Sequence, residues 1–152
     1  VAPGCRGPRR RRWRCRAGPV FIKDIVVLPD GRVVSSAIDG FENLIHIWDP
    51  TDLDAPVVTR SVPNGANTLL VLADGRVAEG RDDGAIAIWN PVAPATPDAE
   101  FSGHGAAVRD MIELPDGRIV SAGDGPTVRI WDPTCAEADT SPIEGLRCLR
   151  VS

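Results

Sequence analysis

The chain has 152 residues and a mass of 16.2 kDa, and 43% of its residues are hydrophobic, which suffices for one ordinary domain with its own core and excludes disorder throughout. Seven arginines lie within the first sixteen residues, so the net charge of −4 combines a basic head with a remainder of 10 basic and 21 acidic residues. Neither a run of roughly eighteen apolar residues nor the apolar segment of a signal peptide occurs, which excludes a membrane span and predicts a soluble, cytoplasmic protein.

An arginine-rich head occupies residues 1–19. Its segment PRRRRWRCR, at 8–16, has the charge density of a nucleic-acid-binding arm, with arginines for phosphates and Trp13 for stacking on a base. The composition changes abruptly after the head, which favours a disordered tail or a spurious start in arginine-rich sequence. Nucleic-acid binding through the head remains an alternative function.

Three segments of the chain repeat one pattern: LPDGRVVSSAIDGFENLIHIWDP from Leu28, LADGRVAEGRDDGAIAIWNP from Leu72 and LPDGRIVSAGDGPTVRIWDP from Leu114. The aspartates that open the turns are 44 and 42 residues apart, and the tryptophans that close the segments are 41 and 42 apart. They are Asp30, Asp74 and Asp116, and Trp48, Trp89 and Trp131. A period of about 40–45 residues predicts blade-like repeat units.

Each unit reads as a meander of antiparallel strands, because an apolar run ends at an Asp-Gly turn and a second hairpin follows. The first unit, 20–62, has expected strands at 22–28, 33–37 and 45–48, with three extra residues in an enlarged turn at 39–42. The second, 63–102, has them at 66–72, 77–79 and 86–89, and the third, 103–142, at 108–114, 118–122 and 128–131. Segments 55–62 and 99–102 are expected to add outer strands.

Both faces of every sheet carry apolar side chains. The residues one and three positions before each tryptophan are Ile or Val, and the tryptophan itself points to the opposite face by two-residue alternation. A small sheet that is apolar on both faces needs a neighbour on each side. We therefore expect the meanders to stack around an axis with the tryptophans between them.

These residues resemble the WD-repeat β-propeller family over roughly residues 20–133, since Trp48-Asp49, Trp89-Asn90 and Trp131-Asp132 end the third strands and Gly103-His104 precedes the third unit. The resemblance implies an all-β fold, a partial β-propeller of about three four-stranded antiparallel blades. It also implies a buried hydrogen-bonded chain formed by His104, Ser121, Asp124 and Trp131. In the other units the resemblance assigns structural roles to Trp48 and Trp89, which correspond to Trp131, and to Asp83, which takes the usual place of the network aspartate.

The first two units depart from this pattern. Gly18 and Val62 stand where His104 would be, and Glu79 replaces the serine, so their buried networks are expected to be incomplete. In the third unit Asp124 lies seven residues before the tryptophan, and Gly125 takes the usual aspartate position.

A closed propeller has about four to eight blades, whereas this chain supplies three. Residues 143–152 read as the truncated start of a further repeat, which favours a fragment of a longer propeller. The alternative is self-association, in which two chains complete a six-bladed ring.

No catalytic, metal or cofactor site is expected. His46, in a strand position that is Ala or Arg in the other units, is interpreted as variable, and Asp82-Asp83-Gly84 lacks the spacing of a calcium loop. Ser121, His104 and Asp124 superficially meet the requirements of a serine nucleophile but belong to the packing network. Cys5, Cys15, Cys135 and Cys148 are expected to be free thiols, because no pair has C-x-x-C spacing.

The leading functional hypothesis is a scaffold module without catalysis that binds a protein or peptide partner. By resemblance, the partner surface comprises the residues that begin each first strand and those of the turn before each third strand: Lys23, Asp24, Asn67, Thr68, Arg109, Asp110, Phe41, Glu42, Arg81 and Asp82. A second hypothesis is that the chain is the regulatory or sensor propeller portion of a larger, bacterial-type multidomain enzyme.

Overall fold

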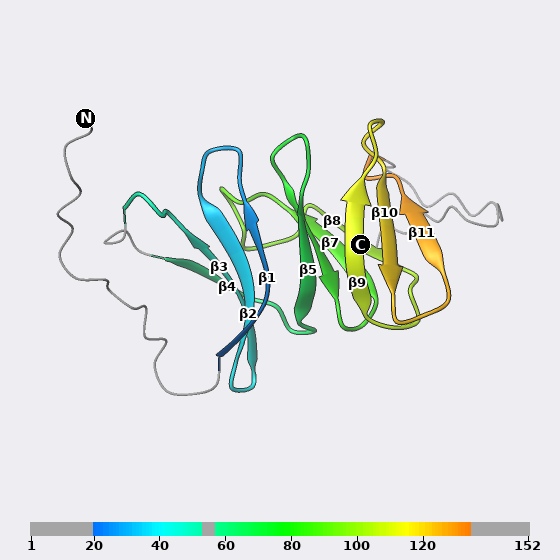
Figure 1. The fold of residues 1–152 in the computed structure, drawn as a ribbon, viewed down its shortest axis with the longest axis horizontal. Helices are drawn as coiled ribbons and strands as arrows, with labels where there is room; N and C mark the ends of the chain where they lie inside the picture. Colours follow the sequence, from blue (N-terminus) through cyan, green and yellow to red (C-terminus); the bar gives the residue numbers. More distant parts are fainter. Residues whose placement is uncertain (1–19, 53–56, 135–152) are drawn as a thin grey trace, which may run out of the picture.

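The computed structural model describes residues 20–52 and 57–134, and these residues form strands joined by turns and loops (Figure 1). The arginine-rich head, the four cysteines and the expected further repeat at 143–152 lie outside the described residues. No helix within the described part of the chain is long and apolar enough to cross a membrane.

Three antiparallel sheets follow one another along the chain, and we call them blades 1, 2 and 3. Blade 1 contains β1 (Val20–Val27), β2 (Val33–Asp39), β3 (Glu42–Trp48) and β4 (Val58–Ser61). Blade 2 contains β5 (Ala66–Val71), β6 (Val77–Arg81), β7 (Ala85–Trp89) and β8 (Ala99–Ser102). Blade 3 contains β9 (Val108–Glu113), β10 (Ile119–Gly123) and β11 (Val128–Trp131), and a fourth strand is not among its described residues.

The first turn of each blade has one geometry. In blade 1, Leu28 N donates to Arg32 O at 2.8 Å, and Gly31 between them has a φ of +89°. The carboxylate of Asp30 accepts from the backbone and the side chain of Arg32. This is a three-residue hairpin loop that ends in a left-handed glycine, as the Asp-Gly pattern predicts.

The second hairpin of blade 1 differs from the enlarged turn expected at 39–42. Asp39 pairs with Glu42, so only Gly40 and Phe41 form the turn, and the extra residues lengthen β2 and β3 to seven residues each. A two-residue turn is possible because Gly40 adopts a φ of +63°. The insertion therefore extends the hairpin and places Phe41 at its tip.

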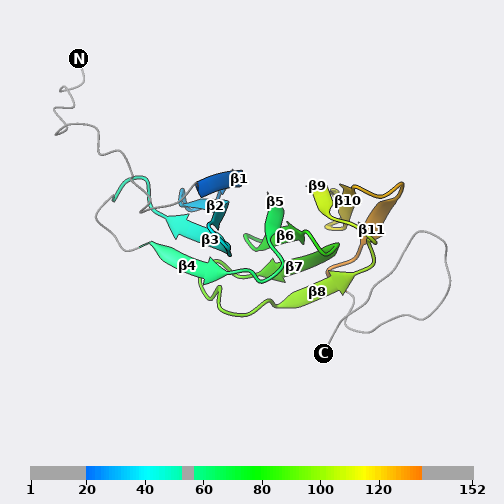
Figure 2. The same ribbon diagram turned by 90° about the horizontal axis from the view of Figure 1, so that it is seen from below.

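The blades stack face to face in an open arc, with β1, β5 and β9 along the inner side (Figure 2). We call the face that carries the tryptophan the Trp face and the opposite one the Ile face. Two buried clusters fill the junctions: Ile45 and Ile47 of blade 1 pack with Trp89, and Ile86 and Ile88 of blade 2 pack with Trp131. Each junction thus joins the Ile face of one blade to the Trp face of the next.

Candidate interaction surface

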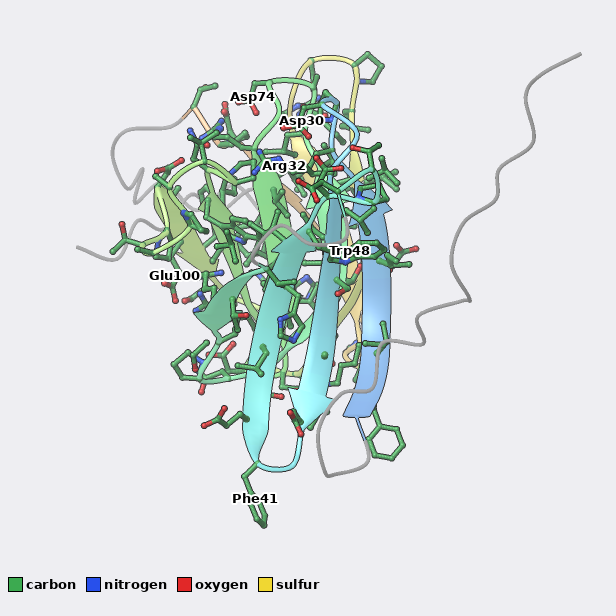
Figure 3. All side chains as sticks on the ribbon, turned by 90° about the vertical axis from the view of Figure 1, so that its left-hand side faces the viewer. Asp30, Arg32, Phe41, Trp48, Asp74 and Glu100 are labelled. Carbon is green, nitrogen blue, oxygen red and sulfur yellow. The ribbon has the colours of Figure 1, made fainter. Side chains whose placement is uncertain are left out.

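The expected partner residues belong to one end of the strands, where the first strand of each blade begins and the second hairpin makes its turn. We call this end of the blades the rim. Phe41 lies at the rim, whereas Asp30, Arg32 and Asp74 lie at the opposite end of the strands (Figure 3). The strands run their full length between the two ends, so the two sets of turns present separate surfaces.

Blades 1 and 2 share a cluster of polar side chains at the rim. Lys23 Nζ donates to Asn67 Oδ1 at 2.6 Å and lies 3.2 Å from Asp82 Oδ2. Asn67 Nδ2 donates to Asp82 Oδ1 at 2.7 Å. The first strand of blade 1, the first strand of blade 2 and the second hairpin of blade 2 therefore meet at one point.

Blade 3 adds a charged pair to the rim, and its arginine acts electrostatically on Asp82 of the cluster. Arg109 forms a bidentate pair with Asp124, with Nε donating to Oδ1 at 2.8 Å. Burial would raise the pKa of Asp82, but hydrogen bonds from Asn67 and Lys23 and the charges of Lys23 and Arg109 outweigh it and lower that pKa below its usual range. The hydrogen bonds and charge of Arg109 likewise lower the pKa of Asp124. Cations and anions alternate across the three blades.

The remaining expected rim residues divide into exposed and buried groups. Phe41 is fully exposed, and Glu42 and Asp110 are exposed. Asp24 is half-buried because its Oδ2 accepts from Leu69 N at 2.7 Å, which fastens blade 1 to blade 2.

Thr68 and Arg81, by contrast, are buried, since each is only 6% exposed, and the structure does not present their side chains at the rim. Thr68 points into the junction between blades 2 and 3, close to Gly80 and Val108. Arg81 points into the junction between blades 1 and 2, where it pairs with Glu79 and Glu100. Strand alternation decides both positions, since neighbouring residues in a strand face opposite sides.

The buried polar chain of blade 3 contains three of its four expected members. Trp131 Nε1 donates to Ser121 Oγ at 2.7 Å, and His104 Nε2 lies 2.7 Å from the same oxygen. Asp124 does not join them: it is an exposed residue bound to Arg109. The seven-residue spacing to the tryptophan places its side chain at the rim instead of beneath the loop.

The buried histidine predicts a loss of stability in mild acid. Burial lowers the pKa of His104 below the ordinary value of 6.5, and the Arg129 charge lowers it further. The unfolded chain therefore takes up a proton as the pH falls below about 6.5 while the folded chain resists it, so stability falls by up to about 1.4 kcal/mol per pH unit. Urea titrations between pH 7 and pH 5.5 should show this slope.

His104→Gln is the matched variant, because glutamine does not titrate. We expect its slope in this pH range to be smaller than that of the wild type. The residual slope comes from His46, whose pKa burial also lowers against the opposing charge of Asp39. An unchanged slope in His104→Gln would contradict this assignment.

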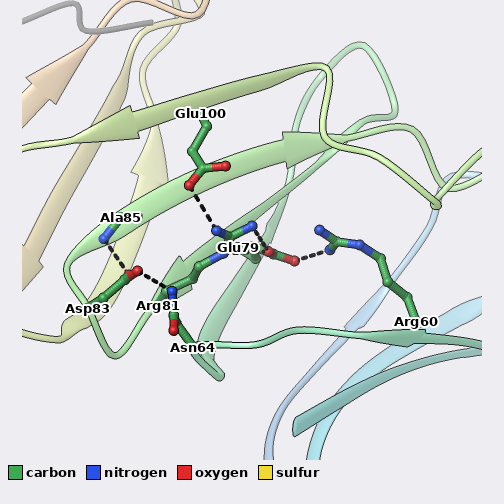
Figure 4. Close-up of polar contacts among 7 residues, drawn as sticks. All are labelled: Arg60, Asn64, Glu79, Arg81, Asp83, Ala85 and Glu100. Atoms are coloured by element: carbon green, nitrogen blue, oxygen red, sulfur yellow. Dashed lines mark hydrogen bonds and ion pairs between the residues drawn. The ribbon is translucent and has the colours of Figure 1, made fainter. Parts of the chain in front are cut away.

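The junction between blades 1 and 2 holds a buried charge network in place of the serine network (Figure 4). Glu79 is fully buried, and its carboxylate pairs with Arg60 from β4 and with Arg81, which lies 2.8 Å away. Arg81 also reaches Glu100 at 3.0 Å. Asp83 stabilises the adjacent turn between β6 and β7. Its carboxylate accepts hydrogen bonds from Ala85 N at 3.0 Å and from Asn64 Nδ2 at 2.6 Å.

The two junctions use equivalent positions differently. Arg60 lies 5.3 Å above the Trp89 ring, at the strand position where Phe101 packs 5.9 Å from Trp131. Glu79 occupies the position of Ser121, and Trp89 Nε1 is buried without a hydrogen-bond partner. The expectation of an incomplete network in the second unit is thus met at the indole nitrogen. Arg60 was not anticipated, although a buried glutamate in an apolar face requires a nearby cation.

His46, His104 and Ser121 have side chains of types that can take part in catalysis, and the structure shows the surroundings of each. His104 and Ser121 are 6% and 1% exposed, so no substrate can reach the pair. His46 Nδ1 lies 3.1 Å from Thr59 Oγ1. Within residues 20–52 and 57–134, no group of three or more His, Cys, Asp or Glu side chains is arranged to hold a metal ion.

Comparisons with known proteins agree with this architecture. Residues 95–132 match the family described as "WD40: WD domain, G-beta repeat". Among solved structures, the WD40 β-propeller domain of Doa1 is similar with a TM-score of 0.61 and 21% identity, over 86% of this chain and 40% of that one. A chain of the Mitotic Checkpoint Complex is similar with a TM-score of 0.62 and 18% identity, over 78% of this chain and 37% of that one.

The chain thus spans about two fifths of the propeller chains it resembles. No curated protein sequence matches it significantly.

Proposed function

We propose that this chain, whose residues 95–132 match the WD40-repeat family and whose blades resemble part of a WD40 β-propeller, is a protein-interaction module that binds a protein or peptide at the rim and catalyses no reaction itself. Assembly with other proteins is in keeping with the similar chain of the Mitotic Checkpoint Complex. The alternative, a regulatory propeller within a larger enzyme, stays a prediction.

The observation that carries the proposal is the row of charged groups across all three blades, bordered by an exposed aromatic ring. Lys23, Asp82, Arg109 and Asp124 are held in fixed positions by mutual hydrogen bonds, so little side-chain entropy is lost when a partner binds. Phe41 is fully exposed and offers an apolar anchor. Aromatic and arginine side chains dominate the energetics of protein interfaces. The rim suits a peptide with one apolar anchor and charges of both signs.

The test selects peptides from a displayed library on the intact 152-residue chain and measures their Kd with purified variants. Phe41→Ser and Arg109→Ser should each raise the Kd about tenfold or more, because aromatic and arginine contacts carry a large share of the binding free energy at interfaces. The measurement is fluorescence anisotropy with labelled peptide.

Two variants serve as matched controls. Arg118→Ser removes an equivalent Arg-Asp pair at the opposite end of the strands, where Arg118 binds Asp116. Val92→Ser removes an apolar side chain that is 80% exposed and lies away from the rim. Both should leave the Kd within about twofold of the wild type. Peptides that respond to the controls and ignore the rim variants would refute the proposal.

A further inference from the structure

Exposed apolar side chains gather on the two blade faces that no other described blade covers. On the Trp face of blade 1, Ile22, Ile25 and Val27 are 57%, 57% and 63% exposed. On the Ile face of blade 3, Ile112 and Val128 are 55% and 67% exposed. Such patches mark surfaces that bury themselves against another protein.

Equivalent positions inside the arc show what covers these faces. Val128 takes the place of Ile45 and Ile86, which are both 0% exposed because a Trp face lies against them. Leu28 and Leu72 are buried at their junctions, whereas the corresponding Leu114 is half-exposed. Blade 3 therefore carries an Ile face built like the two that meet a following blade.

The first blade shows the opposite half of the junction. Ile25 takes the place of Leu69 and Met111, which are each 5% exposed, and Trp48 is half-buried where Trp89 and Trp131 are fully buried. Its open face is thus a Trp face that lacks a preceding Ile face.

We propose that a second copy of this chain covers both open faces, with the Ile face of blade 3 in one copy packed on the Trp face of blade 1 in the other. The occupant follows from the junction rule: Ile face meets Trp face twice within the chain, and the two open faces are one of each kind. The contact is head-to-tail, so two copies closed by a twofold axis form two identical junctions. Two copies of the three described blades give six, which lies within the range of about four to eight with which propellers close.

The polar contacts at the rim agree with this arrangement. Asp24 accepts from its own blade at Ile25 N and from the following blade at Leu69 N. Asp110, its counterpart in blade 3, accepts from Met111 N and makes no further hydrogen bond within the described residues. Its exposed carboxylate is positioned for the same contact with the first strand of a partner copy. This assembly does not depend on the peptide-binding function, because its junctions are formed by the faces of the blades, whereas the rim is formed by one end of their strands.

The first test is the mass of the purified full chain by light scattering during size-exclusion chromatography. The proposal expects one sharp species with the mass of two 16.2 kDa chains. A monodisperse monomer would overturn it and leave the faces to further blades of a longer protein. A broad distribution of large species would overturn it as well, because it would mean that the head-to-tail contacts extend into chains of many copies and do not close into a ring of two.

Single substitutions test the assignment of the faces. Ile25→Asp and Val128→Asp each place a charge in both junctions of the dimer and should raise the dimer dissociation constant about 100-fold or more. Both side chains are exposed in the single chain, so the blades themselves should fold. Val92→Asp, in the loop between β7 and β8 of blade 2, where the side chain is 80% exposed, should leave the dimer intact.

Mixing the two variants distinguishes a head-to-tail contact from a symmetric one. The blade 3 of Ile25→Asp and the blade 1 of Val128→Asp are both unaltered, so the mixture restores one native junction. We expect an equimolar mixture to form a heterodimer under conditions in which each variant alone is monomeric. If the mixture stays monomeric while the wild type dimerises, the head-to-tail arrangement is wrong.

Discussion

Glu79→Ser should lower the free energy of unfolding by about 3–5 kcal/mol, because it removes the anion from a buried pair and leaves the cation behind. Arg60 is 9% exposed and forms a hydrogen bond with the Glu79 carboxylate. Arg81 retains Glu100, but Arg60 has no second carboxylate among its described contacts. The measurement is urea unfolding monitored by tryptophan fluorescence and circular dichroism at constant pH.

Glu100→Ser is the matched control. Like Glu79→Ser, it removes a glutamate carboxylate from this network, but the Glu100 side chain is 36% exposed, so water solvates the charge that remains on Arg81. We expect a loss of under about 1 kcal/mol. Similar losses for the two variants would mean that burial of Glu79 does not determine the strength of its contact.

The double variant Arg60→Phe/Glu79→Ser copies the junction between blades 2 and 3. A phenylalanine would pack on Trp89 as Phe101 packs on Trp131, and the serine hydroxyl could accept from the indole nitrogen that has no partner in the present structure. The buried charges of Arg60 and Glu79 disappear together, and Arg81 retains Glu100, so the double variant should recover more than half of the loss, with a coupling energy of about 1–3 kcal/mol. Recovery is expected because apolar replacements of buried ion pairs are often neutral or stabilising.

Hydrophobic alternation predicted the strands and their stacking because the three copies share it. The Ile positions before each tryptophan and the tryptophan itself face opposite neighbours, which is the arrangement in both buried clusters. The tryptophans of blades 2 and 3 are buried as expected. Trp48 is half-buried because its face is open. A repeated pattern thus identifies the two faces that meet at a junction. Blade 1 and blade 3 each have one such face that no other described blade covers.

The arginine network could not be predicted from the same pattern. Arg60 lies in an outer strand whose sequence has little periodicity, and its role depends on Glu79, which is 19 residues away. The departure of Glu79 from serine was visible in the sequence. Its partner was not, because charge pairing across a junction depends on the register of two blades.

Spacing predicted the rim only in part. The first-strand positions brought Lys23 and Asn67 together, and the turn positions added Asp82. Thr68 and Arg81 were predicted at the rim surface, but both side chains are buried in junctions between blades. A strand residue near the rim points to one face of its sheet or the other, and counting alternate residues from the tryptophan assigns both side chains to buried faces. A stricter application of that alternation would have removed Arg81, which is two residues beyond Glu79.

Gly84→Ala should destabilise the protein by about 3 kcal/mol or more, because it combines backbone strain with a collision. Gly84 has a φ of +84°, and an added Cβ would lie 2.3 Å from His104 O and 2.8 Å from Ala106 O. Both oxygens belong to the loop that carries His104 toward Ser121, and a backbone carbonyl cannot move aside as the end of a flexible side chain can. The collision should therefore displace the loop of blade 3 although the substitution is in blade 2.

Gly75→Ala isolates the backbone contribution, since Gly75 has a φ of +86° and nothing within 4 Å of an added Cβ. Left-handed backbone alone costs an alanine about 1–2 kcal/mol, so the difference between the two variants measures the collision. Urea unfolding gives both losses, and the tryptophan fluorescence of the chain includes a contribution from Trp131 that responds to the loop, because the Trp131 indole binds the same serine as His104. Equal losses and an unchanged spectrum would show that the loop of blade 3 does not rest on the turn of blade 2.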